Sequence, residues 1–96
     1  MTDHHRYASR VAALRLACIQ SGLRLNASHG QVSVHRLGRS VQVHLRENGE
    51  TAHWELPTCP LTGMSAVTGP VGAERRFAKH LAYRLESLAR RRTQAA

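Results

Sequence analysis

Hydrophobic and polar residues alternate most regularly between residues 31 and 56. In three short runs every second position is apolar, which is the period of a strand with one buried side. The alternating apolar positions are Val32 and Val34, then Val41, Val43 and Leu45, then Ala52, Trp54 and Leu56. This pattern predicts three β-strands, at residues 31–37, 40–47 and 50–56.

Two dipeptides between these runs have the composition of tight hairpin turns. They are Gly-Arg at residues 38–39 and Asn-Gly at residues 48–49, and Asn-Gly is the strongest short hairpin signal. With both turns in place, Val34 faces Val43 and Val43 faces Trp54. All the apolar side chains then fall on one side of the sheet, whereas a slip of one residue would scatter them. The sequence therefore predicts an antiparallel meander.

A helical period flanks the meander on both sides. The first predicted helix spans residues 7–21, with Gly22 as a left-handed stop and Leu23 folding back against it. Its apolar positions are Tyr7, Val11, Leu14 and Cys18, widened by Ala12, Leu16 and Ile19. Arg15 falls inside this apolar arc, so it must extend past it to water or the helix has two faces.

The second predicted helix spans residues 73–92, and its apolar spine is Phe77, Leu81, Leu85 and Leu88. Residues 57–72 connect it to the last strand. They hold three Gly, three Pro and no charged residue, which is typical of an irregular loop. The order α–β–β–β–α predicts an α+β fold in one domain, residues 1–96. It consists of a three-stranded antiparallel meander with two helices packed on one face.

The charge balance adds a functional constraint. Fourteen Lys and Arg against six Asp and Glu give a net charge of +8, and all but one of these cations are Arg. Such an excess favours polyanionic partners whatever the fold, and the planar guanidinium matches phosphate. The alternative is that the charge only keeps the protein soluble, for which a net charge of about 2–8 suffices in a small domain. No apolar run suggests a signal peptide or a membrane span, which predicts a cytoplasmic protein without membrane contact.

The last helix is the main candidate site. Seven basic and two acidic residues lie between positions 74 and 92, and the basic ones project opposite the apolar spine. Glu86 is placed to pair with Arg90. Tyr83 lies at the centre of the basic arc, where an aromatic ring can stack on a base. The candidate nucleic-acid-binding residues are Arg75, Arg76, Lys79, Tyr83, Arg84, Arg90 and Arg91. The alternative is a solvated helix face whose terminal arginines complement the helix dipole.

The start of this helix resembles the double-stranded-RNA-binding domain. That family also has α–β–β–β–α order, with a Gly-rich lead into a Lys-Lys-x-Ala-Lys helix start. The corresponding run here is residues 71–82, Val-Gly-Ala-Glu-Arg-Arg-Phe-Ala-Lys-His-Leu-Ala. The resemblance implies that Arg75, Arg76 and Lys79 contact the phosphates of an A-form duplex. The family's longer loop between its first two strands, with a Gly-Pro-x-His element, is replaced here by a tight turn.

Three histidines of the predicted sheet are candidate metal ligands. The predicted register places His44 opposite His53, with Ser33 across from His44 and His35 one diagonal step away. Imidazoles without a carboxylate or thiolate among them make an incomplete zinc site. We therefore expect a solvated cluster, and not a metal centre, at His35, His44 and His53. Glu55 is expected opposite Gln42.

No catalytic motif, phosphate loop or cofactor-binding pattern occurs in the sequence, which predicts a protein that is not an enzyme. Cys18 and Cys59 are expected to be two reduced thiols.

Two functional hypotheses follow. The first is a small basic nucleic-acid-binding module whose last helix contacts phosphates largely independently of sequence, with duplex RNA slightly favoured over DNA. The second is a small phage- or mobile-element-encoded inhibitor of the anti-CRISPR type, which binds a bacterial nucleoprotein complex. Pairing into a homodimer is compatible with either hypothesis.

Overall fold

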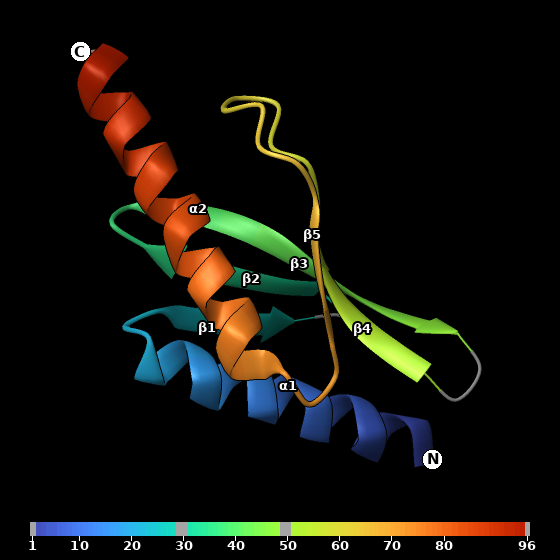
Figure 1. Cartoon of the computed structure of the whole chain (residues 1–96). Helices are drawn as coiled ribbons and strands as arrows, with labels where there is room; N and C mark the ends of the chain where they lie inside the picture. Colours follow the sequence, from blue (N-terminus) through green and yellow to red (C-terminus); the bar gives the residue numbers. More distant parts are fainter. Residues whose placement is uncertain (1, 29–30, 49–50, 96) are drawn as a thin grey trace.

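The fold is α+β, with five strands between two helices (Figure 1). A computed structural model describes residues 2–28, 31–48 and 51–95. Its elements are α1 (Thr2–Gln20), β1 (Arg24–Ser28), β2 (Gln31–Arg36), β3 (Arg39–Asn48), β4 (Thr51–Leu56), β5 (Val67–Pro70) and α2 (Glu74–Ala95). The strands form one antiparallel meander in the order β1-β2-β3-β4-β5. The predicted class is therefore confirmed, but the prediction of three strands is wrong.

The two additional strands lie at the edges of the sheet. β1 pairs with β2, and β5 pairs with β4 inside the segment that was predicted to be an irregular loop. Gly69 of β5 lies opposite Trp54. A Cβ atom at Gly69 would come within 3.1 Å of the Phe77 ring, so glycine lets α2 approach this strand closely.

Both hairpin registers differ from the predicted ones by two residues. Arg36 pairs with Arg39, so the first turn is Leu37-Gly38, and Val41 lies opposite Val34. Because a shift of two preserves the alternation, the apolar side chains still share one face. This turn needs positive φ at both positions, and Leu37 and Gly38 have φ of 57° and 73°.

In the second hairpin Asn48 pairs with Thr51, so Asn48 ends the strand instead of forming the turn. The connecting residues 49 and 50, which include the glycine of the predicted turn, lie outside the described part of the chain. Leu45, not Val43, lies opposite Trp54.

α1 begins at Thr2, earlier than predicted, and ends at Gln20, one residue before the predicted end but with the predicted cap. The N–H of Gly22 bonds to the Ile19 carbonyl at 3.0 Å and that of Leu23 bonds to the Cys18 carbonyl at 2.8 Å. This is a Schellman cap, with Gly22 in the left-handed conformation at φ 76°. The predicted apolar stripe divides, because Val11, Leu14, Ala17 and Cys18 are buried while Ala12, Arg15, Leu16 and Ile19 are exposed.

The core lies between the sheet and α2. α2 crosses the sheet and contacts β2, β3 and β5, while α1 packs against β1 and against α2 (Figure 1). The largest fully buried side chains are Trp54 from β4, Phe77, Leu81 and Leu85 from α2, Leu14 and Cys18 from α1, and Leu23, Val34 and Leu56. Among the described residues, neither helix has the long uncharged apolar stretch that crossing a lipid bilayer requires.

Candidate nucleic-acid interface

One side of α2 packs against the rest of the fold, and the other side is exposed to solvent. Its apolar spine, from Phe77 to Leu88, is buried against the sheet. The opposite side points to solvent, and we call it the outer face of α2. The exposed residues of this face are Arg75, Arg76, Lys79, His80, Tyr83, Arg90 and Arg91. The structure thus places six of the seven predicted binding residues on one exposed surface.

The seventh predicted residue, Arg84, is not available for a ligand. It is only 2% exposed. Its Nη1 donates to the Pro57 carbonyl at 2.7 Å and its Nη2 donates to the Ser65 carbonyl at 2.8 Å. Arg84 lies at the margin of the basic arc, where the loop between β4 and β5 covers it. The prediction that Arg84 contacts phosphate is therefore wrong, because the guanidinium fastens this loop to α2.

Both carboxylates of α2 are bonded to groups outside the outer face. Glu74 is buried, and its Oε2 accepts hydrogen bonds from Trp54 Nε1 at 3.0 Å and from the N–H of Gly72 at 2.9 Å. Glu86 was predicted to pair with Arg90. Instead its Oε1 lies 3.3 Å from Nη1 of Arg36 on β2. Neither acidic group is ion-paired with a cation of the outer face, although Glu86 lines a hollow beside Arg90.

The remaining carboxylates with described side chains are also engaged. Glu47 pairs with Arg10 at 2.8 Å, and Glu55 pairs with Arg46 at 3.2 Å. Within the described part of the chain, no ion pair joins a carboxylate to a cation of the outer face. Five cations and an aromatic side chain that is 57% exposed are thus available on one surface.

The histidines do not converge on a metal site. His44 lies opposite Glu55 and His53 lies opposite Arg46, so the predicted pairing of His44 with His53 is wrong. Ser33 lies opposite Gln42 rather than His44. His35 Nε2 is 3.0 Å from Ser33 Oγ and 3.3 Å from Asn26 Nδ2. Among the residues that the structure describes, no three histidine, cysteine or acidic side chains are grouped to hold a metal ion.

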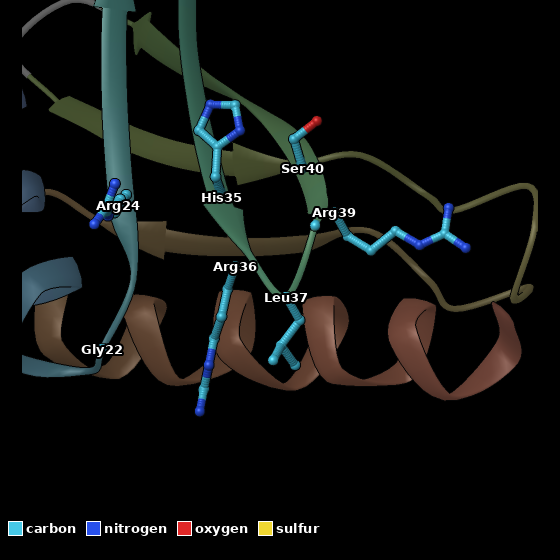
Figure 2. Close-up of a pocket in the computed structure, with 8 residues that line it drawn as sticks. Gly22, Arg24, His35, Arg36, Leu37, Arg39 and Ser40 are labelled. Carbon is cyan, nitrogen blue, oxygen red and sulfur yellow. The ribbon is translucent and has the colours of Figure 1, made fainter. Parts of the chain in front are cut away.

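Sequence reasoning missed a second cationic region, at the end of the β2–β3 hairpin. A hollow of about 500 Å³ lies there, which we call the hairpin hollow (Figure 2). Its lining includes Arg24, His35, Arg36 and Arg39 and both residues of the turn. The signal in the sequence was the pair of arginines that flank the turn. The predicted turn at residues 38–39 contains Arg39 itself, so the prediction does not place the two arginines on either side of the turn.

The two thiols lie in opposite environments, and both are free and largely buried. Burial raises the pKa of Cys18 to about 11. Burial also raises the pKa of Cys59, but two other effects lower it by more. The thiol has hydrogen bonds with the side chain and backbone of Thr62 and the backbone of Leu61, and the positive charge of Arg84 lies nearby. The net result is a pKa below the usual value of 9.0.

Comparison with protein-family models, with curated proteins and with solved structures gives no match to this chain. Any functional conclusion therefore depends on the surfaces described above.

Proposed function

We propose that this protein binds duplex nucleic acid through the outer face of α2, by phosphate contacts that are largely independent of base sequence. One observation carries the proposal. Every carboxylate with a described side chain is buried or ion-paired with an arginine outside the outer face, while Arg75, Arg76, Lys79, Arg90 and Arg91 remain exposed. Such a one-sided array of cations gains free energy by releasing counterions from a polyanion.

The dimensions of the face suit a duplex better than a single phosphate. From Arg75 to Arg91 the helix advances about 24 Å, at about 1.5 Å per residue. The cations form one group in the first two turns and a second group near the C-terminal end, with Tyr83 between them. A surface of this length spans several base pairs. Duplex RNA is the first ligand to test, because the start of α2 carries the motif that resembles the double-stranded-RNA-binding domain.

The test measures affinity for short RNA and DNA duplexes, and for their single strands, over a range of salt concentrations. With five phosphate contacts, log K is expected to fall against log [salt] with a slope of about −4 to −5. Substituting Arg75, Arg76 and Lys79 together by Ala should remove most of the affinity and make the slope shallower by about 2 to 3.

A matched control removes the same formal charge from other elements of the fold, by substituting Arg6, Arg15 and Arg46 with Ala. Arg6 and Arg15 are exposed on α1, and Arg46 is exposed near the end of β3. If this control lowers the affinity and the slope as much as the α2 variant does, net charge and not the outer face governs binding. Weak binding of every free nucleic acid would also contradict the proposal, and would direct attention to the inhibitor hypothesis.

A further inference from the structure

Leu37 occupies a position that suits leucine poorly. It is the first residue of the two-residue turn between β2 and β3, with φ of 57°. Positive φ is rare for residues with a Cβ atom, and Asn, Asp or Gly are the usual choices at this position. Leu37 is the only described residue other than glycine with positive φ. Leucine therefore strains this turn.

The strain is not offset by burial. The Leu37 side chain is 58% exposed, so it contributes little to the hydrophobic core. A strained backbone combined with an exposed apolar side chain points to a role outside folding, since asparagine would relieve both costs.

Cations surround this exposed leucine. On one side lies the hairpin hollow, with Arg24, Arg36 and Arg39 in its lining. On the other side Leu37 borders a second hollow, of about 380 Å³, together with Glu86, Ala89 and Arg90 of α2. Figure 2 shows Leu37 and Arg36 extending from the hairpin over α2, while His35 points to the other side of the sheet. The hairpin tip is therefore adjacent to the C-terminal half of the proposed binding surface.

We propose that Leu37 is an apolar wedge that enters the minor groove of a bound DNA duplex and partly separates two base steps. Proteins that bind the DNA minor groove insert apolar side chains between base steps in this way, and arginines accompany them in the groove. The inference rests on the proposed function of α2 and extends it to the hairpin. The one acidic residue nearby, Glu86, is paired with Arg36. A leucine rimmed by cations suits a groove edged by phosphates better than the charge-depleted centre of a protein interface.

The decisive variant is Leu37→Asn, because stability and binding should change in opposite directions. Asparagine accepts positive φ, so the melting temperature should rise by several degrees. Affinity for the duplex should fall about tenfold, with little change in the salt slope, because the lost contact is apolar. Energy transfer between dyes at the two ends of a duplex should show that the wild-type protein bends it and the variant does not.

Two further variants control the interpretation. Leu37→Met keeps an apolar tip and should retain both the bend and the affinity. Leu61→Asn removes a leucine that is 57% exposed in the loop between β4 and β5, and should leave both unchanged.

The outcomes separate the wedge from the proposed function. If the wild-type protein binds no duplex, both fail. If it binds, and Leu37→Asn binds and bends the duplex as well as wild type, only the wedge fails, and Leu37 is left as a contact for a protein partner. A melting temperature that does not rise would overturn the argument from strain.

Discussion

At the scale of single residues, the two cysteines differ most in their chemistry. Thiolates are the nucleophilic form, so the lower pKa of Cys59 favours reaction at neutral pH. With a pKa of about 11, only about a thousandth of Cys18 is thiolate at pH 8. The direct neighbours of Cys59, from the loop and from Arg84, therefore create a chemical difference between two buried thiols.

We expect iodoacetamide to modify Cys59 first in the native protein, and the midpoint of its rate-against-pH curve should lie below that of an ordinary thiol, since its pKa is lowered. Mass spectrometry of the native protein at a series of pH values measures this. The Cys18→Ala variant should react like wild type, and Cys59→Ser should react only when unfolded. Faster labelling of Cys18 would show that access, and not the thiolate fraction, controls the reaction.

Predictions for single residues failed where the position of a side chain depends on bonds to a segment distant in the sequence. The helical projection correctly placed Arg75, Arg76 and Lys79 on the outer face, because their exposure depends only on the helix and its apolar spine. Arg84 is also an arginine of α2, but it is bound by loop carbonyls that lie about 20 to 30 positions earlier in the chain. The turn was predicted at Gly38-Arg39, and the observed turn at Leu37-Gly38 needs positive φ at a leucine, which a composition rule does not anticipate.

At the scale of elements, the strands with strong alternation were found and those without it were not. β1 has a single buried residue, Leu25, and β5 contains both Gly69 and Pro70. Their pairing comes from neighbours: β1 adds to β2, and β5 adds to β4 beneath α2. A five-stranded sheet therefore could not be derived from period-2 patterns alone.

The junction of β4, β5 and α2 depends on Glu74. Its carboxylate accepts the indole N–H of Trp54 and the backbone N–H of Gly72. Glu74→Ala should lower the free energy of unfolding by about 1–3 kcal/mol, because a buried donor loses its acceptor. Glu74→Gln keeps an acceptor oxygen and should lower the free energy of unfolding by less. Chemical denaturation of the three proteins measures the difference, and equal losses for both variants would assign the role to charge instead of hydrogen bonding.

At the scale of the whole molecule, the excess of positive charge bears on stability as well as on binding. The net charge of +8 implies repulsion among cations, while the exposed ion pairs contribute only about 0–1 kcal/mol each. The balance of charge over the surface therefore opposes the compact state at low ionic strength.

We expect the melting temperature to rise by a few degrees between about 0.05 and 0.5 M NaCl, because salt screens this repulsion. Differential scanning calorimetry checks the shift. The variant that lacks Arg75, Arg76 and Lys79 should melt higher than wild type at low salt and respond less to added salt. A melting temperature that falls with salt would show that the ion pairs outweigh the repulsion.

The burial of Trp54 supplies a probe that separates folding from binding. It is the single tryptophan of the chain, it has no exposed surface, and its indole bonds to the first turn of α2. Its emission should therefore lie at short wavelength in the native state and move to longer wavelength when α2 leaves the sheet. Because the outer face of α2 lies on the opposite side of that helix, a ligand bound there should leave the spectrum unchanged. One chromophore thus reports whether a variant that has lost its ligand is still folded.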